Sequence, residues 1–189
     1  PFFLKVSYFH PHQPVACPEF YYNRYATMDL PPQVCGEWAR KHEFPQTGLP
    51  VRARDGYLNE RFSHQFRAGY YGCINHIDDQ IGRILDVLNP DTVGRETLFV
   101  FLSDHGEMLG DHQILGKRMP FEPSARIPLV IKFPQSMGFR SGQVHTDVVE
   151  LMDIMPTLLE SAGVQVPASV EGRSLLPLAA EEPVAWRPY

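Results

Sequence analysis

The sequence lacks the features that would by themselves place a protein in a membrane or on a nucleic acid. No apolar run approaches the ~20 residues that a membrane-spanning helix needs, so no membrane span is predicted. The formal net charge is −5 and the isoelectric point is near 5.9, which argues against nucleic acid as the main partner. Low-complexity segments and internal repeats are also absent. An anionic substrate would therefore have to be met by a few local cations.

Cysteine is scarce, and the sequence has no initiator methionine. The three cysteines, Cys17, Cys35 and Cys73, have neither the paired spacing of a zinc site nor the even count of a disulfide framework, so we expect free thiols. The sequence begins at Pro1, inside a predicted strand, without a signal peptide. We therefore expect a piece of a longer protein, and the sequence gives no information on its compartment.

The chain does contain enough apolar sequence for a core. With 189 residues and 43% hydrophobic composition, it is long enough for one domain or part of one. Its 18 prolines and 14 glycines predict many loops among the regular elements. Enzymes often build their sites on such long connections, so this composition is compatible with a catalytic domain.

The most informative stretch is an apolar run that ends abruptly in polar residues. Residues 98–102, LFVFL, are predicted to form a strand buried on both faces, as in a parallel sheet, and SDHGE follows at residues 103–107. Ligands bind outside the carboxyl ends of strands in open α/β sheets, so Asp104 and His105 are candidate metal ligands. Lys117, after a glycine-containing loop, could reach an anionic substrate. The alternative is an ordinary turn in which Asp104 caps the following residues.

The order of motifs around this strand is specific. It consists of SDHGE at residues 103–107, LGDH at 109–112, GK at 116–117 and PSARIPLVI at 123–131. This series resembles the sulfatase family of the alkaline-phosphatase superfamily, and VVELMDIMPTLL at 148–159 and GRSL at 172–175 extend the resemblance. The resemblance implies an α/β, alkaline-phosphatase-like fold in which a largely parallel mixed sheet is sandwiched by helices. Residues 1–189 would be the central to C-terminal part of one sulfatase-type catalytic domain.

The resemblance also implies a metal site at the end of the central strand. Asp104 and His105 would ligate one divalent cation, with calcium implied by the family. Manganese and zinc are alternatives, because both accept imidazole more readily than calcium does. Lys117 would contact the sulfate group as a catalytic and substrate-binding residue. His112 is a further candidate for a supporting role, although a simple loop histidine is the safer interpretation.

A second group of histidines follows the first predicted strand. Residues 1–9 are rich in aromatic and β-branched residues, and HPHQP follows at residues 10–14. The resemblance assigns His12 to the sulfate group, as a substrate-binding and catalytic residue. A histidine at this position could also protonate the leaving group. His10 is the weaker candidate. A packing or surface role is the alternative for either histidine.

The strongest periodic pattern predicts a long helix. Residues 57–88 carry apolar side chains every three or four positions, which predicts an amphipathic helix. Asp78 and Asp79 fall on the opposite, solvated face, where Asp79 can pair with Arg83 one turn later, so we assign neither to a metal site. A long loop is expected over residues 17–54, with a short helix near 19–25; the loop either lines the substrate pocket or packs against the scaffold. Strands are expected at residues 127–133 and 144–149, and a helix capped by Gly163 is expected at 151–162.

The implied activity is hydrolysis of small-molecule or carbohydrate sulfate esters by a metal-assisted covalent mechanism. Sulfatases mature a Cys or Ser in Cys/Ser-x-Pro-x-Arg to a formylglycine nucleophile, and no Cys or Ser of this chain fits that motif. We therefore expect the nucleophile in the missing N-terminal part, and we expect the isolated chain to be inactive. Two alternatives remain: a phosphonate monoester or phosphodiester hydrolase of the same superfamily, and a noncatalytic binding domain on the same scaffold.

Overall fold

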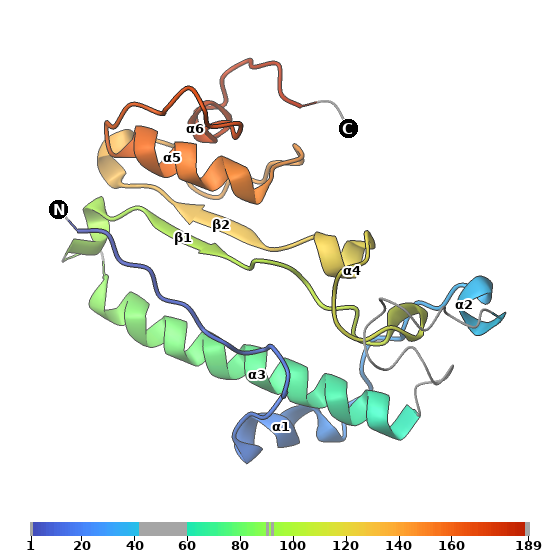
Figure 1. Cartoon of the computed structure of the whole chain (residues 1–189). Coiled ribbons are helices and arrows are strands. Elements are labelled where there is room, and N and C mark those ends of the chain that lie inside the picture. Colours follow the sequence, from blue (N-terminus) through green and yellow to red (C-terminus); the bar gives the residue numbers. More distant parts are fainter. Residues whose placement is uncertain (1, 42–59, 90, 92, 188–189) are drawn as a thin grey trace. The chain divides into compact units, whose positions relative to one another are not determined.

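The computed structural model describes residues 2–41, 60–89, 91 and 93–187, and it combines helices with two short strands. The helices are α1 (Glu19–Ala26), α2 (Glu37–Lys41), α3 (Glu60–Val87), α4 (Glu122–Ala125), α5 (Ile154–Ser161) and α6 (Leu176–Ala179). The strands are β1 (Phe99–Leu102) and β2 (Leu129–Lys132), and single 3-10 turns are η2 (Val93–Glu96), η3 (Asp111–Gln113), η4 (Gln135–Met137) and η5 (Leu151–Asp153). Figure 1 shows these elements along the chain.

The chain divides into two units. The first comprises residues 1–92 and 101–129, and the second comprises residues 93–100 and 130–189. All four residues predicted to form the site, His12, Asp104, His105 and Lys117, belong to the first unit. The geometry of the candidate site can therefore be described within one unit.

Helix α3 organises the first unit, as its periodicity predicts. The predicted helix over residues 57–88 is confirmed from Glu60 to Val87, and residues 57–59 lie outside the described part. One face is buried, and it carries Ser63, Phe66, Arg67, Ala68, Gly69, Gly72 and Cys73. Within the residues that the structure describes, no helix is both long and apolar enough to cross a membrane.

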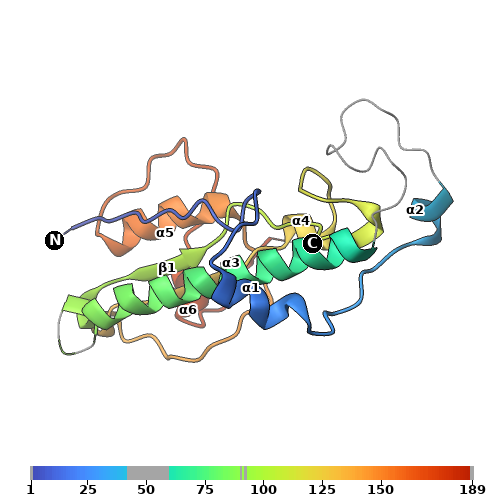
Figure 2. The ribbon, with the colours of Figure 1, turned by 90° about the horizontal axis from the view of Figure 1, so that it is seen from below.

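Helix α1 packs along α3, as both ribbon views show (Figures 1 and 2). The predicted short helix near residues 19–25 is thereby confirmed. Asp78 and Asp79 are exposed, as expected of the solvated face. The predicted pairing of Asp79 with Arg83 is wrong, because Asp79 Oδ2 accepts a hydrogen bond from Tyr21 Oη at 2.6 Å. Arg83 Nη1 instead donates to a neighbouring glutamine on its own helix at 2.8 Å.

The two strands form a two-stranded sheet and run in opposite directions (Figure 1). Strands were predicted at residues 98–102 and 127–133, and both are confirmed with shorter bounds. The expectation that the first is buried on both faces is wrong for the described chain, since its side chains are half-buried or, at Phe101, exposed. The largely parallel arrangement of a larger sheet stays a prediction.

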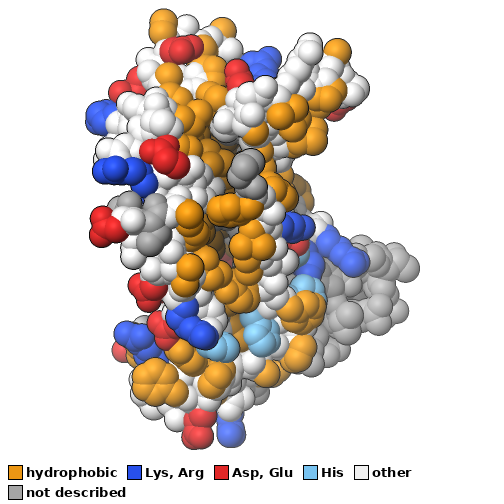
Figure 3. Space-filling model, turned by 90° about the vertical axis from the view of Figure 1, so that its left-hand side faces the viewer, with side chains coloured by type: hydrophobic (Ala, Val, Ile, Leu, Met, Phe, Trp, Pro, Cys, Tyr) orange, Lys and Arg blue, Asp and Glu red, His pale blue; other side chains and the backbone are white. Residues whose placement is uncertain are grey.

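Two further predicted strands, at residues 1–9 and 144–149, are not formed among the described residues. Residues 2–9 are rich in apolar side chains, yet most of these are exposed; Phe3, for example, is 81% exposed. Figure 3 shows that hydrophobic side chains are also exposed elsewhere on the surface that it presents. A high strand propensity is insufficient here because a strand also needs a neighbouring chain to accept its backbone hydrogen bonds.

Helix α5 is the main helix of the second unit. The helix predicted at residues 151–162 is confirmed as η5 followed directly by α5. Gly163, with φ of +70°, ends it in the left-handed conformation expected of a glycine cap. Pro156 is buried in the first turn of α5, where its missing N–H costs no helical hydrogen bond.

Candidate active site

The candidate site begins where β1 ends. Ser103 Oγ donates a hydrogen bond to the backbone oxygen of His105 at 2.7 Å, and the backbone N–H of His105 donates to Asp104 Oδ1 at 3.0 Å. These bonds fold the chain into a tight turn. The Asp104 side chain is 82% exposed and that of His105 is 35% exposed. The turn therefore presents a carboxylate and an imidazole to solvent.

The imidazole of His105 is held in a form suited to bind a metal. Its Nδ1 lies 2.8 Å from the backbone oxygen of Gly106, which can only accept a hydrogen bond, so Nδ1 carries the proton. In the neutral imidazole the lone pair is then on Nε2, which lies 3.5 Å from Asp104 Oδ2. Metal-binding histidines commonly have their second nitrogen fixed in this way. Asp104 Oδ2 and His105 Nε2 are thus two neighbouring donor atoms.

Gly106 anchors this turn against α4. Its N–H donates to the backbone oxygen of Ser124 at 2.9 Å. A Cβ atom at this position would lie 2.0 Å from the backbone oxygen of Pro123, so only glycine fits. The glycine of the Asp-His-Gly sequence therefore has a packing reason, which fixes where the preceding two side chains point.

A hairpin-like loop connects this turn to Lys117. The Glu107 carboxylate accepts hydrogen bonds from the N–H groups of Gly116 and Leu109, and the N–H of Met108 donates to the backbone oxygen of Gly116 at 2.8 Å. Met108 is fully buried, which gives the loop an apolar base. Gly116 is thereby held next to the residues that follow His105.

Lys117 follows Gly116 directly. Its side chain is half-buried, and it makes no hydrogen bond or ion pair with any residue in the described part of the chain. The Glu107 carboxylate, the nearest anion along the loop, accepts backbone N–H bonds instead. The lysine ammonium therefore has no recorded partner and could bind an anion.

His112 supports the loop rather than the metal pair. Its Nδ1 accepts a hydrogen bond from the N–H of Gly36 at 3.1 Å, and its own N–H donates to Val34 O at 2.7 Å. Its ring contacts those of Trp38 and Phe121, with centroids 5.0 and 4.9 Å away, and these two rings also stack on one another. The interpretation of His112 as a structural loop histidine is favoured, because these contacts engage its Nδ1, its backbone N–H and its ring.

The long loop over residues 17–54 contacts this hairpin where it is described. Gln33 Nε2 donates to the backbone oxygen of Leu109 at 2.8 Å and to Ser63 Oγ at 2.7 Å. The N–H of Val34 donates to Asp111 Oδ1 at 2.9 Å. Packing is therefore one role of this loop; residues 42–54 lie outside the described part, and a pocket-lining role stays a prediction.

His12 lies on a separate turn. Its N–H donates to the backbone oxygen of Phe9 at 3.1 Å, and its Nδ1 lies 2.8 Å from the backbone oxygen of Gln13. The ring contacts that of Phe9 at 4.8 Å between centroids, and the side chain is exposed. Among the described residues, no recorded contact joins His12 to Asp104, His105 or Lys117. Their convergence on one anion stays a prediction.

Glu107 and Gln33 are the supporting residues that sequence reasoning missed. Glu107 was part of the SDHGE motif, but no sequence signal indicates that its carboxylate accepts the N–H of Gly116, nine positions later. Gln33 has no local signal at all. A side chain that holds a distant loop is visible only once the loop is folded.

The donors present fit part of a metal site. In the described ranges, no group of three or more His, Cys, Asp or Glu side chains is arranged to hold a metal ion. Asp104 and His105 supply two donors, whereas calcium takes six to eight oxygen ligands and structural zinc takes four. The pair is compatible with a divalent metal only if further ligands come from elsewhere.

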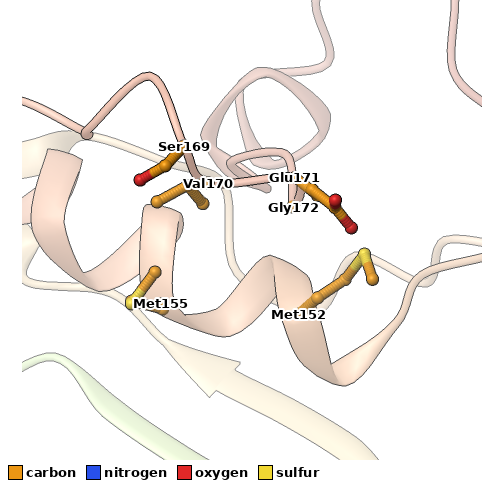
Figure 4. A pocket seen from close by; sticks show the side chains of 6 residues that line it. All are labelled: Met152, Met155, Ser169, Val170, Glu171 and Gly172. Atoms are coloured by element: carbon orange, nitrogen blue, oxygen red, sulfur yellow. The ribbon is translucent and has the colours of Figure 1, made fainter.

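A cavity of about 500 Å³ in the second unit is a different feature (Figure 4). Its lining consists of Met152, Met155, Ser169, Val170, Glu171 and Gly172. Glu171 is its one charged residue, and a carboxylate repels an anionic ester. None of the four predicted site residues lines it, so this cavity has the wrong chemistry for a sulfate group.

Comparison with known proteins identifies the family. The sulfatase family model matches residues 1–164. The chain belongs to the sulfatase family. It is 43% identical to an arylsulfatase of Clostridium perfringens over all of the chain and 40% of that protein. It is 37% identical to the multifunctional alkaline phosphatase superfamily protein PehA of Trinickia caryophylli over 99% of the chain and 39% of that protein.

Solved structures give the same assignment at the level of the fold. The phosphonate monoester hydrolase of Agrobacterium radiobacter superposes with a TM-score of 0.86 at 31% identity, covering 99% of this chain and 40% of that one. The fold of this sulfatase-family chain is therefore of the α/β, alkaline-phosphatase-like class. The chain spans about two-fifths of the length of these relatives.

Proposed function

We propose that the full-length protein containing this chain hydrolyses sulfate esters. The observation that carries the proposal is the turn after β1, where Asp104 Oδ2 and His105 Nε2 lie side by side at 3.5 Å. Lys117, without a recorded partner, is attached to the same loop. The family, and a 43% identical relative described as an arylsulfatase, support this reading of the site.

The 189 residues would form the central to C-terminal part of one catalytic domain. In the full protein, we expect β1 and β2 to belong to a larger, largely parallel mixed sheet sandwiched by helices. The support is the phosphonate hydrolase structure, which covers 99% of this chain within only 40% of its own length. The exposed apolar side chains of residues 2–9 are compatible with a strand of that larger sheet.

Asp104 and His105 would hold one divalent cation, calcium by family resemblance, with manganese or zinc as alternatives because an imidazole is among the ligands. Such a cation neutralises ester oxygens and polarises a nucleophile. The residues of this chain supply the carboxylate and the oriented imidazole. The remaining ligands would come from the part of the protein outside this chain.

Lys117 and His12 would contact the transferred sulfate group. Negative charge shifts toward the leaving oxygen as the ester bond breaks, so fixed cations stabilise the transition state more than the ground state. His12 Nε2 has no recorded partner among the described residues, and a protonated His12 could pass its proton to the leaving oxygen. Lys117 would then stabilise the transition state electrostatically, and His12 would transfer the proton.

The nucleophile would lie outside this chain. Cys17 is followed by Pro-Glu, Cys35 by Gly-Glu and Cys73 by Ile-Asn, so none is in the sequence that sulfatases mature to formylglycine. Membership of the family supports a formylglycine in the full-length protein. The isolated 189-residue chain should hydrolyse no sulfate ester at a useful rate, because the remaining cations cannot replace covalent catalysis.

A phosphonate monoester or phosphodiester hydrolase is the second candidate function. It is favoured by the TM-score of 0.86 to a phosphonate monoester hydrolase and by the 37% identity to a protein described as multifunctional. The same metal pair and the same cations would serve either ester, because both transferred groups are compact anions. The residues of this chain therefore identify the scaffold better than the ester.

The test is a comparison of ester classes on the full-length protein. Turnover would be measured with aryl esters that share one leaving group and differ only in the transferred group: a sulfate, a phosphonate monoester and a phosphodiester. A kcat/KM highest for the sulfate supports the sulfatase, and a kcat/KM highest for either phosphorus ester favours the second candidate. No turnover of any ester, after divalent metals are supplied, would favour a noncatalytic binding domain.

A further inference from the structure

The loop over residues 107–118 carries four formally charged side chains: Glu107, Asp111, Lys117 and Arg118. Its two carboxylates are occupied by backbone groups. Glu107 accepts N–H groups of its own loop, and Asp111 Oδ1 accepts the N–H of Val34 at 2.9 Å. Within the described ranges, no ion pair or hydrogen bond joins the side chain of Lys117 or Arg118 to another residue. The loop therefore presents two adjacent cations, neither of which is paired with a carboxylate of the described chain.

The segment over residues 117–121, which contains both cations, is tied to the turn after β1 at each end. Gly116, just before it, accepts the N–H of Met108 at 2.8 Å. Ser124, three residues after it, accepts the N–H of Gly106 at 2.9 Å. Gly106 and Met108 are separated by a single residue, so the segment begins and ends beside one point of the chain. Both cations therefore lie in a short loop next to the predicted metal pair.

Neither the backbone nor the packing at Arg118 accounts for an arginine. Its φ is +82°, a left-handed conformation that a glycine adopts at lower cost than a residue with a Cβ atom. Its side chain is exposed, so it fills no space in the core. The property that remains is the guanidinium, whose planar set of N–H groups binds oxyanions with two parallel hydrogen bonds.

We propose that Arg118 binds a second anionic group of the substrate, carried by the leaving group of the ester. The inference rests on the proposed function, in which Lys117 contacts the transferred sulfate. Consecutive Cα atoms are about 3.8 Å apart, so a substrate held by Lys117 lies within reach of the guanidinium beside it. Lys117 is half-buried and Arg118 is exposed, which places the transferred group inward and the second anion outward. The substrate class is a sulfate ester whose alcohol bears a further sulfate or a carboxylate.

A general attraction between the loop and any doubly charged ligand is the competing explanation. Arg126 separates the two, because it lies in the same unit and is also an exposed arginine, at 83%. Its Nη1 lies 3.8 Å from the carboxylate of Glu122, so it already has an anionic partner. A general field effect would be weakened equally by loss of Arg118 or Arg126, whereas a direct contact depends on Arg118 alone.

The experiment measures binding of two sulfonates to the full-length protein supplied with divalent metal. Benzenesulfonate and benzene-1,3-disulfonate share one ring and differ by one anionic group, and neither has an ester bond to hydrolyse. Isothermal titration calorimetry gives both Kd values. Two equivalent groups favour the disulfonate by a factor of about two from statistics alone, and we expect a preference of at least about tenfold, as one added charge-assisted contact provides.

Three variants assign this preference to a residue. Arg118→Gln should reduce the preference to about twofold, with the loss falling mainly on the disulfonate. It keeps a side chain with a Cβ atom, so the cost of the left-handed backbone is unchanged. Arg118→Lys should retain part of the preference, because it keeps the charge and loses the paired N–H geometry. Arg126→Gln, the matched control, should retain all of it.

Three outcomes would overturn the inference: no preference beyond the statistical factor in the unmutated protein, a full preference in Arg118→Gln, or equal losses in Arg118→Gln and Arg126→Gln. Turnover of phenyl sulfate tests the proposed function separately. Turnover without a disulfonate preference would leave sulfate hydrolysis in place and remove the role of Arg118. A disulfonate preference that depends on Arg118, without turnover of any sulfate ester, would support the anion contact and contradict the proposed hydrolysis.

Discussion

Two aspartates, Asp104 in the first unit and Asp153 in the second, show how differently one carboxylate can be used. Asp104 is 82% exposed, and its recorded neighbours are the backbone N–H and ring of His105. Asp153 is fully buried and accepts hydrogen bonds from the backbone N–H groups of Glu150 at 2.9 Å and Arg173 at 2.8 Å. The guanidinium of Arg187 adds two more, both at 2.6 Å.

The electrostatic surroundings of Asp153 match a structural role. Burial raises its pKa, but the hydrogen bonds from Arg187 and from the backbone of Arg173 and Glu150 lower it more, so its pKa lies below the usual range. Gly172 allows this arrangement, because a Cβ there would lie 2.0 Å from Met152 O. The GRSL motif at residues 172–175 therefore serves to satisfy a buried aspartate.

Asp153 therefore stabilises the fold, whereas Asp104 is free to bind a ligand. Both oxygens of Asp153 are engaged with groups of its own chain, so no lone pair remains directed at a ligand. Asp104 keeps Oδ2 beside Nε2 of His105, and a cation could bind between these two atoms. Loss of Asp153 should reduce stability, and loss of Asp104 should reduce function.

The largest effect is expected from Asp153→Asn. The change removes the buried charge that compensates Arg187, whose side chain is only 18% exposed, and leaves it the half-exposed carboxylate of Glu150 at 3.2 Å; it also weakens the capping hydrogen bonds. Breaking a buried pair from one side typically costs about 3–5 kcal/mol of unfolding free energy. Denaturant unfolding of the full-length protein would measure this loss of unfolding free energy, with the exposed Glu160→Gln on α5 as the control. A loss under about 1 kcal/mol would contradict the role of Asp153.

Removing the free cation should have the next largest effect. In the full-length enzyme, we expect Lys117→Ala to lower kcat by about 10²–10³, the range seen when one transition-state donor is lost, or about 2.7–4 kcal/mol. The unfolding free energy should change little, because Lys117 has no recorded partner in the described part of the chain. Arg126→Ala is the matched control, since that guanidinium is 83% exposed. Equal losses in both variants would mean a general charge effect.

The sequence allowed the turn after β1 to be predicted but not the Asp153 network. An apolar run that ends in Asp-His-Gly is a local pattern, and its position at the end of a strand follows from that pattern alone. Two partners of Asp153, Arg173 and Arg187, are in contrast 20 and 34 residues away. The sequence pattern around Asp153 indicated the family and no role, because its hydrogen bonds to Arg173 and Arg187 form only after distant segments fold together.

The same limit explains the other expectations that the described chain does not show. The strands at residues 1–9 and 144–149 were predicted from composition, which describes a segment without its neighbours. The pairing of Asp79 with Arg83 was predicted from helical spacing, and Tyr21 on another helix provided a partner instead. Long periodic α3 was predicted well because its signal extends over many turns.

The contribution of Asp153 should depend on pH. Its folded pKa is lowered, so its stabilisation is fully present above the unfolded value of ~3.9 and is lost as the pH falls through the folded pKa. The difference in unfolding free energy between the unmutated protein and Asp153→Asn should therefore be constant from about pH 5 to 7 and shrink below about pH 4. Denaturant unfolding at several pH values measures it. If this difference in unfolding free energy instead grew on acidification, the folded-state pKa of Asp153 would be raised rather than lowered.

Weakening the hairpin should have a smaller effect on catalysis. Glu107→Gln replaces the carboxylate that accepts the N–H of Gly116, so Lys117 becomes less well positioned. We expect kcat to fall by roughly tenfold, or about 1.4 kcal/mol, with metal content unchanged. If Glu107 only stabilises the fold, the melting temperature will fall while kcat is retained. Asp111→Asn, elsewhere on the same hairpin, is the control.

The smallest effect on stability is expected from Asp104→Ala, and this prediction tests the comparison directly. Its carboxylate is exposed and bonded only within its own turn, so in metal-free full-length protein the unfolding free energy should change by no more than about 0.5 kcal/mol. Elemental analysis should nevertheless show that the variant has lost a bound divalent metal, because one of its two donors in this chain is gone. Equal metal content in both proteins would remove Asp104 from the metal site. A large loss of stability without metal would make Asp104 a structural carboxylate like Asp153.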